Sequence, residues 1–313
     1  MVTPATSSGG SPGAARAAAP QAGDPITAEA VVPLLRPPAP GASWHAGQPF
    51  EYRAECASTN AALKDMAEQS AAGTTLATDA QTGGRGRLGR TWLSQPGLDL
   101  TFSVLLRPAL EPAKGHLLAL ATGVAVAQAL EEGFGLAGQV SLKWPNDVLL
   151  GDRKVCGILL EASAGADRIT WAVAGIGLNV NSEPSRVLAS LSSEQAMEWR
   201  GRPEPVSLKE HLGTTVPRAP LLAALLARFT WWWSALDRPG AGPGAAHSLL
   251  EEWRKRDALA GRPVEVFAGP DRSELAAAGE AAGLGEEGQL LVRTGDGAFV
   301  EVFAGDVSVS AAV

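Results

Sequence analysis

The 313-residue chain has only two cysteines, one tyrosine and three methionines, and it has no long uninterrupted apolar run. Two cysteines exclude a framework of several disulfides. Free thiols at Cys56 and Cys156 in a reducing compartment are expected, with a single disulfide between them as the alternative. No apolar run reaches the roughly 18 residues that a membrane span requires. The N-terminal sequence lacks a charged stretch followed by a continuous apolar one, so no secretory signal is indicated. We therefore predict a cytoplasmic protein.

Positive charge is also scarce, with 26 Lys and Arg against 33 Asp and Glu, a net charge of −7 and a pI near 5.2. This balance gives no global attraction to nucleic acid or to an anionic membrane. A hydrophobic content of 45% is ordinary for a protein with a proper core. The length favours one large domain and a small one.

Three segments differ in composition. Residues 1–45 are rich in Ala, Pro, Gly and Ser and cannot bury enough apolar surface to offset the entropy of ordering, so a flexible tail is expected there. Deleting that tail is expected to leave the activity nearly intact. A catalytic domain is predicted over 46–260. Over 261–313, short β runs broken by turns such as 295–297 predict a small β-barrel.

Strands and helices are expected to alternate in the central segment. Ser58 or Thr59 is a candidate cap for a short helix. The three residues from Gly151 to Arg153 separate two strand-like runs and predict an antiparallel hairpin. Residues 183–218 are expected to be irregular. Strands are predicted at 50–54, 74–81, 98–108, 139–150, 154–163 and 169–180, and helices at 115–135, 221–236 and 247–259. Together they indicate an α+β fold.

The segment GGRGRLGR, at residues 83–90, contains a literal G-x-G-x-x-G. A dinucleotide-binding turn needs a helix after the glycines and an acidic residue about 20 positions later. Here Pro96 and a β-type alternation follow, and Asp99 and Glu111 miss the required offset. The dinucleotide interpretation is therefore excluded.

The same segment carries Arg85, Arg87 and Arg90 within an acidic chain. Glycines let the backbone approach a ligand, and arginines offer forked donors to carboxylate and phosphate. Taken alone, the segment leaves a solvated basic turn as the alternative.

Three further motifs have both a functional and a structural interpretation. In KWPND, Lys143 suits a phosphate and Trp144 a purine, but a core Trp before a turn at Pro145 fits equally well. Lys154 lies on an otherwise apolar strand, where it either reaches to the surface or clamps an anion. Asn179 ends a strand at a glycine-rich turn, where a structural amide is the ordinary role.

In this order and spacing, the motifs resemble the biotin protein ligases (biotin–acetyl-CoA-carboxylase ligases). The resemblance covers about residues 50–313 and rests on STN at 58–60, Gln81 with GRGRLGR, KWPND, RKVCGILLE, GIGLNVN and the C-terminal GRPVEV…FAGDVSV. It implies a class II synthetase-like domain with a mixed, largely antiparallel sheet and flanking helices, followed by an SH3-like barrel. Thr82 and Leu88 replace polar or basic residues often found at those positions, which bears on fine loop contacts only.

The resemblance implies a reaction in two steps. The carboxylate of biotin attacks the α-phosphate of ATP to give biotinyl-5′-AMP and pyrophosphate. A lysine of the biotin carboxyl carrier protein of acetyl-CoA carboxylase then attacks the mixed anhydride. Mg²⁺ is expected to arrive on the triphosphate, with its protein ligands unassigned. Membrane and DNA are not expected partners, and a homodimer is left open.

The resemblance also implies site residues. Arg87, Lys143 and Lys154 would neutralise the negative charges of the phosphates and of the carboxylate. Lys154 would lie nearest the reacting carboxylate. Asp147 would orient a lysine or a metal-bound water. The residues expected to bind biotin are Ser58, Thr59, Asn60, Gln81, Arg85, Gly86, Arg87, Trp92, Lys154 and Gly157. The residues expected to bind ATP are Arg87, Arg90, Trp144, Asn146, Asp147 and Asn179.

Two alternatives remain. A lipoate–protein ligase would keep the lysine but has no need of the Gln81 and GRGRLGR loop. A DNA-binding repressor would need a winged helix-turn-helix, which many family members carry at the N-terminus. Residues 1–45 lack helical periodicity and are too rich in proline for such a domain.

Overall fold

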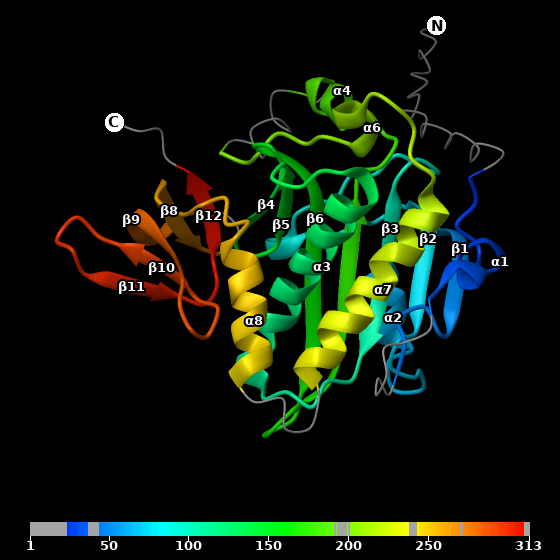
Figure 1. Cartoon of the computed structure of the whole chain (residues 1–313), viewed down its shortest axis with the longest axis horizontal. Helices are drawn as coiled ribbons and strands as arrows, with labels where there is room; N and C mark the ends of the chain where they lie inside the picture. Colours follow the sequence, from blue (N-terminus) through cyan, green and yellow to red (C-terminus); the bar gives the residue numbers. More distant parts are fainter. Residues whose placement is uncertain are drawn as a thin grey trace, which may run out of the picture.

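The computed structural model describes residues 24–36, 44–190, 192, 199, 201–237, 243–269 and 272–309. It contains a large sheet covered by helices and a smaller sheet beside it (Figure 1). The strands of the large sheet are β1 (Phe50–Cys56), β2 (Thr75–Gln81), β3 (Leu100–Leu106), β4 (Val140–Lys143), β5 (Asp147–Leu150), β6 (Arg153–Ala164) and β7 (Ile169–Leu178). The strands of the smaller sheet are β8 (Pro263–Ala268), β9 (Glu274–Leu284), β10 (Leu290–Arg293), β11 (Phe299–Val302) and β12 (Asp306–Val309).

The large sheet has the order β1-β2-β3-β7-β6-β5-β4, and among its pairs only β1 and β2 run parallel. The predicted antiparallel hairpin joins β5 and β6. The run expected as one strand at 139–150 is instead two antiparallel strands, because residues 144–146 turn the chain. The glycine segment leads from β2 into the antiparallel β3 rather than into a helix, so the exclusion of a dinucleotide fold is confirmed.

Helices cover both faces of the large sheet. Helices α3 (His116–Phe134), α7 (Arg218–Asp237) and α8 (Pro243–Arg254) lie on one face, where they share a core with inward side chains such as Phe102 (Figure 1). The short helix α2 (Thr59–Asp65) packs on the opposite face, with Leu63 against the outward side chains of β2, β3 and β7. The mixed sheet with flanking helices confirms the predicted α+β class.

Helix α3 is apolar on all sides because it lies between the sheet and the two other long helices. With the preceding turn η3 (Pro112–Lys114), it is the one stretch among the described residues that is long and apolar enough to cross a membrane. Of its most apolar part, 67% is buried inside the structure. Polar residues interrupt the stretch, which is why the sequence shows no continuous apolar run. In this fold it is a core helix.

The segment expected to be a flexible tail is packed where the structure describes it, at residues 24–36 and 44–45. It forms helix α1 (Ala28–Val31) and the turn η1 (Val32–Leu34) against α7. Ile26 and Val31 are fully buried. The expected tail over 1–45 is therefore wrong for these residues, because Ile26 and Val31 bury apolar surface and Asp24 pairs with Arg218 of α7. Residues 1–23 and 37–43 lie outside the described residues.

The segment expected to be irregular also contains helices. Helix α4 (Pro184–Ala189) begins with proline, which suits the first helical turn. Helix α6 (Leu208–Leu212) begins with a capping box, in which Ser207 and Glu210 each satisfy a backbone N–H of the other. The expectation for 183–218 is corrected accordingly. Both helices are too short to show a clear apolar period in the sequence.

The smaller sheet is antiparallel throughout, with the order β11-β10-β9-β8-β12. This arrangement fits the predicted small β domain, and the domain boundary at residue 260 stays a prediction. The two cysteines are free thiols, as predicted.

Candidate active site

One cavity of about 240 Å³ is lined by side chains from both sheets and from the glycine segment that follows β2. Which of these side chains bind biotin and which bind ATP stays a prediction. Every site residue predicted from the sequence lines this cavity: Ser58, Thr59, Asn60, Gln81, Arg85, Gly86, Arg87, Arg90, Trp92, Lys143, Trp144, Asn146, Asp147, Lys154, Gly157 and Asn179.

The start of helix α2 supplies polar groups to the cavity. Ser58 caps the helix by accepting a hydrogen bond from the backbone N–H of Ala61 at 3.4 Å. The backbone N–H of Thr59 donates to Gln81 Oε1 at 2.8 Å. The Gln81 amide nitrogen lies so close to Gly84 that a Cβ there would stand 2.8 Å from it. Glycine at this position therefore makes room for the Gln81 amide.

Three hydrogen bonds orient the Asn60 amide. Its Nδ2 donates to the Leu159 carbonyl at 3.2 Å and to Glu161 Oε2 at 2.9 Å, and the Ser103 hydroxyl lies 2.6 Å from its Oδ1. A Cβ on Gly175 would stand 2.1 Å from the same Oδ1. Ser103 is fully buried, and a hydroxyl within a mostly apolar strand is the sequence signal that points to it.

The glycine segment folds back on itself. The backbone N–H of Gly86 donates to the Arg90 carbonyl at 2.7 Å, and the 3-10 turn η2 (Arg87–Gly89) forms the tip. Leu88 in this tip has a φ of 57°, a left-handed conformation that is unfavourable for leucine. Leu88, which replaces a polar or basic residue often found at this position in the biotin protein ligases, is therefore a strained residue.

Arg87 connects the loop to two other segments. Its Nη1 donates to Asn146 Oδ1 at 3.2 Å and to the Gly305 carbonyl at 3.4 Å. Burial lowers the pKa of Arg87, while the carboxylates of Asp147 and Asp306 act in the opposite direction. The two carboxylates therefore help to keep the buried guanidinium of Arg87 charged.

The two lysines of the cavity are both held by oxygen atoms. Lys154 Nζ lies 2.6 Å from Asp147 Oδ1 and 5.5 Å from the centre of the Trp92 ring, so its side chain does not simply reach into solvent. Lys143 Nζ donates to the Val307 carbonyl at 2.6 Å, and burial lowers the pKa of Lys143. The cavity therefore gathers cations in an otherwise acidic chain.

Asp306 is a cavity residue that the sequence analysis missed. Arg90 Nη1 donates to its Oδ1 at 3.0 Å, Arg90 Nη2 contacts its Oδ2, and Arg272 Nε lies 2.6 Å from Oδ2. Burial by itself would raise the pKa of Asp306, but the bonds from the two arginines hold that pKa well below its usual range. Asp306 lies in the segment FAGDVSV, where nothing in the sequence singles out this aspartate. The smaller sheet thus contributes a carboxylate to the cavity.

Trp144 and Asn179 also have the structural contacts that the alternative interpretation expected. The Trp144 indole is 2% exposed and donates to the Gly288 carbonyl at 3.2 Å. Asn179 Nδ2 donates to the Val206 carbonyl at 3.1 Å. Both residues line the cavity and both hold the surrounding backbone in place.

Comparison with known proteins identifies the family. The model of the biotin/lipoate A/B protein ligase family matches residues 53–181. The biotin–[acetyl-CoA-carboxylase] ligase of Paracoccus denitrificans is 31% identical over 236 residues, which are 75% of this chain and 90% of that protein. The chain belongs to the biotin/lipoate A/B protein ligase family. The predicted resemblance is confirmed.

Two further relatives of this ligase family extend the comparison. The bifunctional ligase/repressor BirA of Bacillus subtilis (strain 168) is 41% identical over 140 residues, which are 44% of this chain and 42% of that protein's length. The biotin protein ligase from Aquifex aeolicus, solved in complex with biotin and ATP, has a TM-score of 0.66 at 29% identity. That match covers 83% of this chain and 99% of the solved chain, so the two proteins share a fold over most of their lengths.

Proposed function

We propose that the chain attaches biotin to a lysine of the biotin carboxyl carrier protein of acetyl-CoA carboxylase, with ATP, through biotinyl-5′-AMP. The observation that carries this proposal is a single cavity with amide and hydroxyl groups in one part and cations in another. The first part, around Thr59 and Gln81, suits a polar uncharged ring. The second, around Arg87, Lys143 and Lys154, suits a carboxylate and phosphates.

The polar part recognises biotin in this proposal. Ser58, Thr59, Asn60 and Gln81 hydrogen-bond the ureido and valeryl groups, and the backbone of 85–87 closes over them. Because Thr59 N–H occupies Gln81 Oε1, a ligand at Gln81 meets the amide nitrogen, which is a donor. A donor there suits the ureido oxygen.

The first step joins two anions. A carboxylate oxygen of biotin bonds to the α-phosphorus of ATP, and the bond from that phosphorus to the pyrophosphate oxygen breaks. The three cations offset the repulsion between the reactants, and each such preorganised donor typically contributes about 3 kcal/mol. Lys154 lies nearest the carboxylate in this assignment, and Asp147 holds its ammonium in place.

The second step transfers the acyl group. The amine nitrogen of the carrier lysine bonds to the acyl carbon, the bond from that carbon to the AMP oxygen breaks, and the amine loses a proton. The product is an amide, with AMP as the leaving group.

Mg²⁺ fits this site as an ion that arrives with the triphosphate and neutralises part of its charge. Within the described residues, no three His, Cys, Asp or Glu side chains are grouped to hold a metal. Asp147 is paired with Lys154, and Asp306 with Arg90 and Arg272. These pairings favour a nucleotide-borne ion over a resident one.

The test is pyrophosphate exchange into ATP, measured with biotin and with lipoate in parallel. We expect exchange with biotin and none with lipoate, followed by transfer of labelled biotin to the carrier protein. Exchange with lipoate alone would contradict the proposal and favour the lipoate ligase alternative.

Two associated proposals concern location and partners. A cytoplasmic location is supported by the free thiols of Cys56 and Cys156. DNA is not a proposed partner, which a gel-shift assay with the intact chain tests. The oligomeric state, with a homodimer as one outcome, is measured by sedimentation.

A further inference from the structure

A buried arginine joins the N-terminal segment to the interior of the large sheet. Arg218, the first residue of α7, has a side chain that is 1% exposed. Its backbone N–H donates to Asp24 Oδ1 at 2.9 Å, its Nε to Asp24 Oδ2 at 3.0 Å and its Nη2 to the Asp24 carbonyl at 2.6 Å. Asp24 thus fixes the backbone and the guanidinium of Arg218 together.

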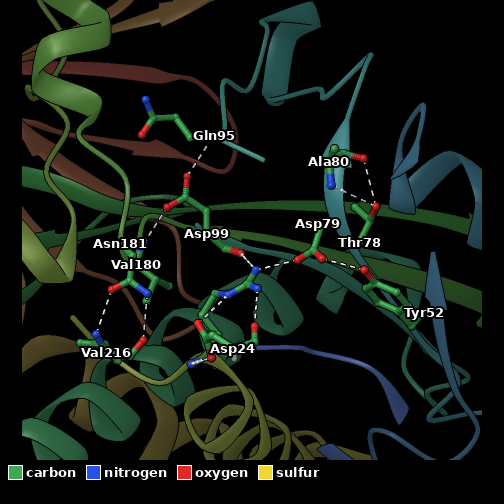
Figure 2. A network of polar contacts seen from close by, with 11 residues as sticks. Asp24, Tyr52, Thr78, Asp79, Ala80, Gln95, Asp99, Val180, Asn181 and Val216 are labelled. Atoms are coloured by element: carbon green, nitrogen blue, oxygen red, sulfur yellow. Dashed lines mark hydrogen bonds and ion pairs between the residues drawn. The ribbon is translucent and has the colours of Figure 1, made fainter. Parts of the chain in front are cut away.

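The other side of the guanidinium faces two strands. Arg218 Nη1 donates to Asp79 Oδ1 at 2.7 Å and to the backbone carbonyl of Asp99 at 3.1 Å. The Tyr52 hydroxyl donates to the second oxygen of Asp79 at 2.6 Å. Figure 2 shows Asp24 of the N-terminal segment lying close to Asp79 and Asp99. Each oxygen that Nη1 meets belongs to the segment running from β2 to β3.

From Asp99 the network continues to the cavity wall. The Asp99 carboxylate accepts the backbone N–H of Gln95 at 3.1 Å and that of Val180 at 2.9 Å (Figure 2). The Gln95 side chain accepts the backbone N–H of Glu183 at 3.0 Å. The turn at 179–183 is therefore bonded to residues 95–99, and within these residues Asp99 is held by Arg218. Gln95, Asp99, Asn179 and Ser182 all line the cavity.

We infer that Asp24 and Arg218 are positioning residues for the part of the cavity wall that faces the nucleotide. The inference rests on the proposed function, in which Asn179 faces ATP. Asp24 is essential in this arrangement because it accepts hydrogen bonds from Nε and Nη2 of Arg218. Only Nη1 of Arg218 is then left to reach both Asp79 and Asp99. Without Asp24, the guanidinium is free to turn toward the Asp79 carboxylate and to release the Asp99 carbonyl.

This arrangement predicts a selective kinetic effect. The turn at 179–183 borders the nucleotide part of the cavity, whereas Thr59, Asn60 and Gln81 are held by separate bonds to Ser103 and to each other. Loss of the Asp24 contact should therefore raise the KM for ATP about tenfold while the KM for biotin changes by less than about twofold. A purely structural role would lower stability and would not separate the two constants.

The experiment compares the full-length chain with Asp24→Ala and with Asp167→Ala. Asp167 is exposed in the turn between β6 and β7, away from the cavity, and serves as the matched control. Biotin-dependent pyrophosphate exchange gives both KM values, and a thermal melt on the same samples confirms that each variant is folded. Should Asp24→Ala not fold, Gln95→Ala removes the bond to Glu183 at the far end of the network and carries the same expectation.

The outcomes separate the two proposals. A parent protein without biotin-dependent exchange overturns the proposed function. With an active parent, a rise in the KM for ATP alone supports the inference. If the KM values for ATP and biotin rise together, or if neither moves while the melting temperature falls, Asp24 and Arg218 have no positioning role.

Discussion

The Trp92 indole occupies the space that a side chain at Gly177 would need, because a Cβ there would stand 2.3 Å from Trp92 Cε2. A Cβ at Gly157, the register partner of Gly177 on the adjacent strand, would stand 2.8 Å from Trp92 Cζ3. Two glycines on neighbouring strands thus form the surface on which Trp92 lies. They fix the ring against which Lys154 is held.

Gly177→Ala should displace Trp92 and weaken biotin binding. The added methyl cannot fit at 2.3 Å, and overpacking of this kind typically costs about 1–3 kcal/mol. The KM for biotin in pyrophosphate exchange is therefore expected to rise about tenfold or more. Gly165→Ala is the control, because a Cβ there meets nothing closer than 3.8 Å. An unchanged KM for biotin in Gly177→Ala would show that Trp92 does not wall the biotin site.

Lys154→Ala should lower adenylate formation far more than it lowers stability. The Lys154 and Asp147 side chains are 21% and 14% exposed, and such a partly solvated pair contributes on the order of 1 kcal/mol to stability. Loss of a cation beside the reacting carboxylate should cost at least about a hundredfold in rate. Pyrophosphate exchange and a thermal melt are measured on one sample, with the exposed Lys114→Ala as control. Unchanged exchange contradicts the proposed role.

The motifs around the cavity could be predicted from the sequence because each combines residue types that rarely serve packing alone. Lys154 in an apolar strand and three arginines among glycines are such combinations. Asp306 and Ser103 could not be predicted, since an aspartate at the start of a strand and a serine inside one are common. Their roles depend on distant contacts: Asp306 binds Arg90, which lies 216 positions earlier in the sequence, and Ser103 binds Asn60, which lies 43 positions earlier.

The N-terminal segment shows a second limit of the sequence. Its composition is that of a flexible chain, but Ile26, Val31 and Asp24 each find a partner in the folded domain. Composition averages over many residues, whereas docking depends on a few side chains and on a buried arginine elsewhere. The expected irregularity of 183–218 failed for a related reason, because caps and a proline can define helices of five or six residues.

Truncation at two positions tests the packed segment. Removal of residues 1–23 preserves the contacts described for Asp24, Ile26 and Val31, so we expect the melting temperature not to change. Removal of residues 1–36 deletes the fully buried side chains of Ile26 and Val31 and exposes the apolar surface that they cover. It also removes Asp24, one of the two carboxylates that pair with the buried charge of Arg218. We expect the free energy of unfolding to fall by at least about 3 kcal/mol. Equal stability of the two truncated chains in urea would show that residues 24–36 do not contribute to the fold.

Tyr52, the sole tyrosine of the chain, should titrate far above its ordinary range. Burial, together with the hydrogen bond to Asp79, raises the pKa of Tyr52 to about 12. Because the folded-state pKa lies above the unfolded value of about 10, the protonated phenol stabilises the fold below pH 10. That contribution is lost as the pH rises through about 12.

The phenolate absorbance of the parent protein reports this titration directly, with no other tyrosine to interfere. Between pH 10 and pH 12, the urea midpoint should fall further for the parent than for Tyr52→Phe. Asp79→Asn should move the titration to lower pH. A tyrosine that titrates near pH 10 in the folded parent protein contradicts the buried contact.

Arg87→Gly should leave the chain able to form biotinyl-5′-AMP but poor at retaining it. Closing a glycine-rich loop costs on the order of 1–2 kcal/mol for each backbone residue that becomes fixed. Arg87 offsets part of that cost, since it already binds Asn146 and the Gly305 carbonyl and can add charge-assisted bonds to an anion, each about 1.5–3 kcal/mol. Without it, the intermediate should dissociate at least about ten times faster.

The escaped anhydride then acylates lysines on unrelated proteins, which gives the loop prediction a second readout. Dissociation of biotinyl-5′-AMP is followed directly, and biotin labelling of albumin is measured in the same reaction. Arg168→Gly serves as the control, because Arg168 is exposed in the turn between β6 and β7 and does not line the cavity. We expect albumin labelling with Arg87→Gly only. If Arg87→Gly retains the intermediate as long as the parent and labels nothing but the carrier, the bonds from Arg87 to Asn146 and Gly305 do not hold the loop over the site.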